Sequence, residues 1–264
     1  MVPMKDLKTS GALAERRDEM LRRLGRHRKK GVWTEPPPKG QYRKVRPTAE
    51  RVVPYHDGEP EPIIPVDDLY SLPREDAFVT VNAYDALILN SKNLLIVDID
   101  FGNPRYEEHG GAADVPEVLT WLRRLKRLDQ HLSRRFGSPY FPLEHPQFSA
   151  QSYTVYRTAA GCRVICTSRP FPWATDGWLA THFMRFMRAD PQYMALCEAQ
   201  KCYRARLTPK PWRDRAGYGR ACRIAGHCNP QTTNDPSLLA QRMLHDEISG
   251  VIEYPISVEE RYLA

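Results

Sequence analysis

Two aspartates, Asp98 and Asp100, end the apolar run at residues 94–101. Every position from 94 to 97 is apolar, which is typical of a central strand buried on both faces. Because side chains alternate across a strand, both carboxylates should point to the same side. Neighbouring carboxylates repel each other, and Mg²⁺ or Mn²⁺ is the usual counter-charge for such oxygen ligands. The pair predicts a metal site; the alternative is a strand end whose aspartates cap the turn at residues 102–104.

A second segment, residues 156–169, is rich in arginines and hydroxyl groups. Gly161 is expected to supply a tight turn between strands at 153–157 and 163–167, and this pairing would bring two arginines together. Guanidinium and hydroxyl groups in such an arrangement can hold a triphosphate or a backbone phosphate. The alternative is an ordinary hairpin with solvated arginines. The candidate nucleotide-binding residues are Arg157, Thr158, Arg163, Thr167, Ser168 and Arg169.

Two further groups of residues could bind a partner or a metal. In the proline-bounded segment 208–213, Trp212 could stack on a base while Lys210 and Arg213 contact phosphates. The alternative for the tryptophan is packing on the core. Four cysteines form a weak candidate for a zinc site, because their spacing is wider than that of a usual zinc knuckle. The alternative is that they are free, buried thiols. They are Cys197, Cys202, Cys222 and Cys228, with His227 beside the last.

The charge of the chain favours a polyanionic partner. The net charge is +7 with a pI of about 9.1, and residues 11–46 hold twelve Lys or Arg against four Asp or Glu. Arginine is dense again at 123–135 and 204–223. Such a distribution suits phosphate contacts, although solvated surface faces would also account for it. The chain lacks a membrane-spanning run and a signal-like apolar start, so we expect an intracellular, cytoplasmic protein.

The pattern predicts an α+β fold with a largely antiparallel sheet. Residues 1–66 should form a basic, proline-rich, flexible arm with a short helix at 11–30, and residues 67–264 the compact domain. The turn at 90–93 predicts a hairpin between the strands at 86–90 and 94–101. A proline at 116 suits the first turn of a helix. Helices are expected at 116–136, 177–188, 191–199 and 237–248, and further strands at 77–82 and 203–207.

A hairpin that ends in hydrophobic-Asp-hydrophobic-Asp, followed by a helix and a glycine-turn hairpin, resembles the archaeo-eukaryotic primase superfamily of primases and primase-polymerases. The resemblance covers roughly residues 77–250. Asp98 and Asp100 match the first motif, and the hairpin at 161–167 is similar in place to the second, where a histidine normally contacts the nucleotide. This chain has Arg163 there instead. The third motif is another acidic residue, for which Asp176, Asp235 and Asp246 are available.

The resemblance implies a recognition-motif-like core and a metal-dependent nucleotidyltransferase. Asp98 and Asp100 would be its catalytic metal ligands, Mg²⁺ or Mn²⁺ the cofactor, and nucleoside triphosphates and DNA or RNA its partners. A non-catalytic nucleic-acid-binding protein on the same scaffold is the alternative. A haloacid dehalogenase-like phosphatase is a weaker one, because residues 101–103 do not carry the Gly-Thr that normally follows its Asp-x-Asp.

Overall fold

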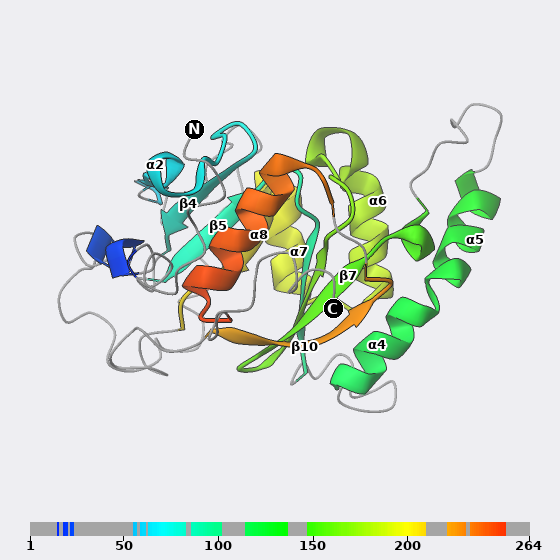
Figure 1. Ribbon diagram of the computed structural model, residues 1–264. Helices are drawn as coiled ribbons and strands as arrows, with labels where there is room; N and C mark the ends of the chain where they lie inside the picture. The colour runs from blue at the N-terminus through cyan, green and yellow to red at the C-terminus, as the bar shows by residue number, and fades with distance from the viewer. Residues whose placement is uncertain are drawn as a thin grey trace.

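The computed structural model describes residues 15, 18–20, 22–23, 55–56, 59–61, 63–82, 86–101, 114–136, 147–209, 221–230 and 233–251. Within these residues the fold is α+β, with two four-stranded antiparallel sheets and helices packed against them (Figure 1). The expected class and the mainly antiparallel pairing are therefore confirmed. None of the described helices combines the length and the apolar character needed to cross a bilayer.

The first sheet has the strand order β3-β4-β5-β9. Its central strands are buried at every position, which suits their mainly apolar sequences; the polar Thr80, Asn90 and Ser91 are buried with them. A short helix, α2 (Asp67–Tyr70), connects the first two strands. The strands are β3 (Ile63–Ile64), β4 (Ala77–Val81), β5 (Leu87–Ser91) and β9 (Tyr203–Arg206), and a separate ribbon pairs β1 (Tyr55–His56) with β2 (Glu59–Pro60).

The second sheet has the order β10-β7-β8-β6 and carries the aspartate strand at one edge. Its members are β6 (Ile96–Asp100), β7 (Tyr153–Thr158), β8 (Gly161–Cys166) and β10 (Cys222–Cys228). The predicted hairpin of β7 and β8 is confirmed. The hairpin expected between β5 and β6 is wrong, because β5 pairs with β4 and β9 and so has both edges occupied. The turn instead carries the chain into the other sheet, and the Ser91 hydroxyl accepts the Leu94 amide at 2.7 Å.

Along the chain, pairs of helices alternate with the strands of the second sheet. Helices α4 (Val115–Arg123) and α5 (Leu125–Phe136) lie between β6 and β7, and α6 (Trp173–Phe186) and α7 (Pro191–Gln200) follow β8. The chain then enters β9, which lies next to β6 although it is hydrogen-bonded to β5. The one helix expected over 116–136 is two, because the Arg124 amide turns back to bond the Trp121 carbonyl.

Opposite faces of the second sheet pack on different helices. Tyr153 on β7 stacks on Phe183 of α6, with ring centroids 5.4 Å apart. Tyr156 lies three positions further along β7, so its side chain points to the other face. It contacts His245 of α8 (Pro236–Ile248) edge-on, with ring centroids 4.8 Å apart. Figure 1 shows α8 running alongside the strands, with α4 and α5 at the edge of the molecule. We call the side covered by α8 the α8 face.

Part of the expected arm packs on the body. Met20 is fully buried, and Arg23 donates to the Pro65 carbonyl. Glu61 is also buried and pairs with Arg204 at 3.0 Å. Some residues before position 67 thus belong to the first sheet, because β3 pairs with β4.

Candidate functional site

The two aspartates lie where the strand prediction placed them. Both are on β6, and since their positions differ by two they share the α8 face of the sheet. The side chain of Asp98 is 33% exposed, and Asp100 is exposed at the strand end. The edge of β6 is closed by other groups, because Tyr193 donates to the Ile96 carbonyl at 2.6 Å. The carboxylates thus stand on a fixed backbone and still reach solvent.

Arg163 holds Asp98 through both carboxylate oxygens. It lies directly opposite Asp98 on β8, and its Nε and Nη2 donate at 2.7 and 3.1 Å. Burial lowers the pKa of Arg163, but the charge and hydrogen bonds of Asp98 outweigh it and leave that pKa above its ordinary value. A carboxylate offers about four acceptor positions and this fork uses two, so Asp98 keeps acceptor capacity toward solvent. Arg163, which was expected to contact a nucleotide, is buried and pairs with Asp98.

The same guanidinium joins β6 to β9 and α8. Its Nη1 donates to the Arg206 carbonyl at 3.0 Å and approaches His245 Nε2 at 3.1 Å. Because arginine can only donate, Nε2 of His245 must accept, and its proton therefore sits on Nδ1, 2.8 Å from Asp246. His245 is fully buried. A chain of directed hydrogen bonds thus runs from α8 to Asp98, and no sequence pattern indicated it.

Asp190 is a carboxylate near the pair that the sequence reasoning missed. Its amide donates to the Asp98 carbonyl at 2.9 Å, and its side chain caps α7 by accepting from the Gln192 amide. Burial is the largest cause that raises its pKa, and the charges of Asp100 and Asp98 raise it further. The local signal was an Asp-Pro step at the start of a helix, which indicates an N-cap and nothing about a metal.

The three acids considered from the sequence lie elsewhere. Asp176 pairs with Arg169 at 2.8 Å, and Asp235 caps α8. Asp246 contacts His245, so it touches the site only through the hydrogen-bond chain. The third acidic group near Asp98 and Asp100 is therefore on a helix cap and not on a strand.

Gly161 has a different role from the turn that was expected. It begins β8, and a Cβ atom there would come within 1.8 Å of the Ile99 carbonyl oxygen of β6. The turn itself is made by residues 159–160. Glycine is thus required because two backbones approach closely at the level of Asp100, which pairs with it.

Arg157 and Arg163 lie on opposite faces of the sheet. The register sets Tyr156 opposite Arg163, and Arg157 opposite Cys162 on one side and Arg223 on the other. The Arg157 guanidinium lies 4.7 Å from the Phe101 ring centroid. Thr158 accepts the Gly161 amide within the turn at 3.1 Å. The expectation that the two arginines converge is therefore wrong.

The other three candidates lie at the far end of β8. Thr167 is buried, and Ser168 donates to Gln151 at 2.8 Å. Arg169 pairs with Asp176 and stacks on Phe171, 4.5 Å from the ring centroid. A strand of six residues separates this end from Thr158, roughly 20 Å at 3.3 Å per residue. The six predicted residues do not form one phosphate cradle.

The described part of the chain contains no group of three His, Cys, Asp or Glu side chains already arranged to hold a metal ion. The zinc candidates are spread out: two lie at opposite ends of β10, and two lie at the end of α7 and just before β9. All four, Cys197, Cys202, Cys222 and Cys228, are free cysteines. The oxygen donors of Asp98 and Asp100 remain the donor set that suits Mg²⁺ or Mn²⁺. Lys210, Trp212 and Arg213 lie outside the described residues.

Comparison of the chain with protein-family models, with curated proteins and with solved structures gives no match.

Proposed function

We propose that this protein is a metal-dependent nucleotidyltransferase of the primase or primase-polymerase type, with Asp98 and Asp100 as metal ligands. The observation that carries the proposal is their placement on one face of a rigid strand end, with Asp98 held by Arg163 and still partly exposed. Nucleotidyl transfer requires such preorganised carboxylates, because its catalysis is mostly positioning and charge stabilisation. Nucleic acid and nucleoside triphosphates are the partners that this activity implies.

The order of elements supports a recognition-motif-like core. The sequence β6, two helices, β7, β8, two helices and β9 is a β-α-β-β-α-β arrangement, with β8 between β6 and β7 and with β9 beside β6. Asp98 and Asp100 come from the first strand of that arrangement, where the primase resemblance sets its first motif. The additional strand β10 extends the sheet beyond β7.

The donor set fits a hard divalent cation. Asp98 and Asp100 supply the carboxylate oxygens. Asp190 is not arranged with them as one metal-binding group, but its pKa is raised, after burial, by the charge of the other two. A bound cation would neutralise this charge and the triphosphate, and would stabilise the leaving pyrophosphate. In this proposal Arg163 is a positioning residue, because its guanidinium orients Asp98 from a buried site.

The test is nucleotide incorporation on primed and unprimed single-stranded templates with Mg²⁺ or Mn²⁺. Asp98→Asn/Asp100→Asn keeps the shape of both side chains and removes their charge. Glu75→Gln/Glu198→Gln, at two exposed positions, is the matched control for the change in charge. We expect product from the wild type and the control and none from the aspartate variant. Product from the aspartate variant at the wild-type rate would contradict the proposal.

One observation favours a second candidate, a non-catalytic nucleic-acid-binding protein. The Arg163 fork already neutralises Asp98, and an ion pair of this kind can be a purely structural joint between strands. Under this alternative the wild type binds template and incorporates nothing under any metal. Binding would also survive the change at Asp98 and Asp100, so the same set of variants distinguishes the two candidates.

A further inference from the structure

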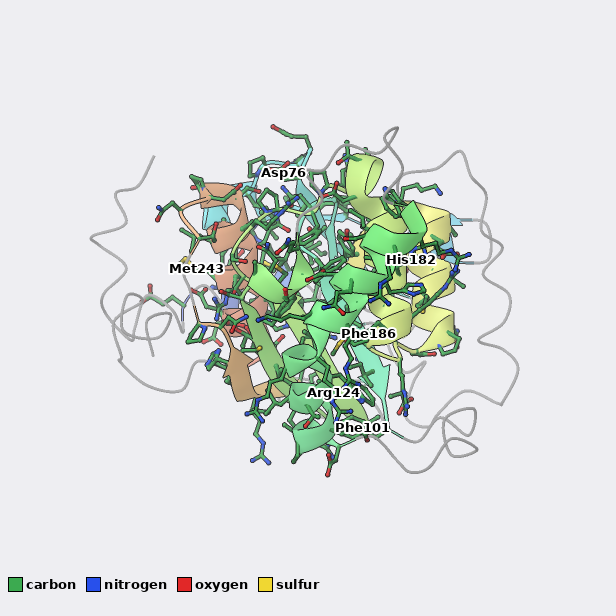
Figure 2. All side chains as sticks on the ribbon, turned by 90° about the vertical axis from the view of Figure 1, so that its right-hand side faces the viewer. Asp76, Phe101, Arg124, His182, Phe186 and Met243 are labelled. Atoms are coloured by element: carbon green, nitrogen blue, oxygen red, sulfur yellow. The ribbon has the colours of Figure 1, made fainter. Side chains whose placement is uncertain are left out.

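The outer face of α5 is a basic surface unrelated to the aspartate site. Leu125, Leu128 and Leu132 are buried and fix which side of the helix faces the body. On the opposite side, at helical spacing, every residue is exposed and none is acidic or apolar. We call this side the α5 basic face; its residues are Lys126, Arg127, Gln130, His131 and Arg134. Figure 2 looks onto this side of the molecule, with Arg124 at the junction of α4 and α5.

The positive charge of this face is not compensated by the helix itself. The only carboxylate of α5, Asp129, lies on the inner side and accepts the Phe148 and Ser149 amides, each at 2.9 Å. Lys126, Arg127 and Arg134 form no ion pair with another described residue. Arg123 and Arg124, both exposed, extend the charge to the end of α4.

The chemistry of the face selects its partner. An anionic membrane is disfavoured, because interfacial helices insert an apolar side and here the leucines are already packed into the protein. Stacking on unpaired bases is also disfavoured, since the face has no aromatic side chain other than His131. What remains are charged donors along about 12 Å from residue 126 to residue 134, at 1.5 Å per residue. This length matches roughly three phosphates at 3.4 Å per step of one strand.

We propose that the α5 basic face binds the sugar–phosphate backbone of a nucleic-acid duplex, without reading its sequence. The inference rests on the nucleic-acid partner of the proposed function, but not on Asp98, Asp100 or turnover. It assigns the docking of duplex to α5 and the end of α4 and leaves the aspartate site for nucleotide chemistry.

The test is fluorescence anisotropy of the full chain with a random 20-base-pair duplex and a 20-nucleotide single strand, over a series of salt concentrations. The variant Lys126→Gln/Arg127→Gln/Arg134→Gln removes three phosphate contacts. Each contact contributes about 0.9 to the slope of log K against log salt for duplex, so the slope should fall by 2 to 3. Duplex binding near 0.1 M salt should weaken at least about tenfold.

The control variant Arg22→Gln/Arg74→Gln/Lys201→Gln removes the same charge from exposed positions away from α5. It should leave both the slope and the affinity within about twofold of the wild type. Equal losses in the two variants would reduce the effect to net charge and overturn the proposal. The proposal would also be overturned if the α5 variant bound duplex as tightly as the wild type. A variant that lost binding to phosphatidylserine vesicles but kept binding to duplex would overturn it too. Thermal unfolding checks that both variants fold.

The outcome is separable from that of the proposed function. If the α5 variant binds duplex normally while the wild type incorporates nucleotides, the proposed duplex-binding role of the α5 basic face is overturned and the proposed activity is not. If the α5 variant loses duplex binding and the wild type never incorporates nucleotides, the proposed role of the α5 basic face is supported and the proposed activity is overturned.

Discussion

Replacing Arg163 with methionine removes the central donor of the site while keeping much of the side-chain volume. Arg163 makes two hydrogen bonds to Asp98, one to the Arg206 carbonyl and one to His245. Each buried acceptor left without a donor costs about 1–3 kcal/mol. Removing one partner of a fully buried ion pair costs about 3–5 kcal/mol, and the partial exposure of Asp98 reduces that figure. We therefore expect the free energy of unfolding to fall by about 3 kcal/mol.

Urea unfolding followed by circular dichroism measures this loss. Arg169→Met is the matched control, because Arg169 also pairs with an aspartate, Asp176, at 2.8 Å but is 33% exposed. A pair of that kind contributes at most about 1 kcal/mol. If Arg163→Met costs no more than Arg169→Met, the hydrogen-bond chain does not stabilise the fold and the reasoning is refuted. A double-mutant cycle with Asp98→Asn then gives the energy of the pair itself.

Three further predictions concern groups around the site. Gly161→Ala should lower the melting temperature strongly or prevent folding, because its Cβ would lie 1.8 Å from a β6 carbonyl oxygen, whereas Gly226→Ala meets only a flexible side chain at 3.2 Å and should be mild. Asp100→Asn should lower the pKa of Asp190, seen by NMR titration, since it removes a repelling charge. The raised pKa of Asp190 favours folding below about pH 4 and costs stability as pH rises through it, so this variant should be more stable at pH 7. Burial raises the pKa of Cys162 to about 11, so its alkylation, followed by mass spectrometry, should be slow at pH 8.

The strands and most helices followed from local pattern. The run before Asp98 is apolar at every position, and the structure gives the end of that run and both aspartates as β6, which begins at Ile96. The hairpin of β7 and β8 was also apparent, and so was the start of α4, where Asp114 accepts the Glu117 amide and a proline follows the cap. These features depend on neighbours within a few residues, which is the range over which propensity and capping act.

The register of the β7–β8 hairpin could not be predicted from the sequence. This register determines whether Arg157 and Arg163 lie on the same face, as the expected phosphate-binding site required. In the structure Tyr156 faces Arg163, so Arg157 points to the other side. A shift of one residue would have placed the two arginines directly opposite each other, because side chains change face with every residue. The close approach of Gly161 to β6 and the pairing of Asp98 with Arg163 belong to the other edge of β8, where they go with the register between β8 and β6.

The third carboxylate could not be predicted because only tertiary packing brings it to β6. Asp190 is ninety residues beyond Asp100 in the chain and belongs to a helix cap, while the resemblance directed attention to acids on strands. The partner of Asp98 was missed for a similar reason: the sequence shows an arginine in a hairpin and not which carboxylate it faces. The joint between His245 of α8 and Arg163 likewise depends on how α8 packs on the sheet.

The most direct test of the central claim is a titration of the protein with Mn²⁺ in the presence of a nucleoside triphosphate, followed by electron paramagnetic resonance. Wild-type protein should sequester Mn²⁺ and alter its signal beyond the effect of the nucleotide alone. Asp98→Asn/Asp100→Asn should lose that binding, while Glu75→Gln/Glu198→Gln should retain it. Equal Mn²⁺ binding by the wild type and the aspartate variant would contradict the assignment of Asp98 and Asp100 as metal ligands.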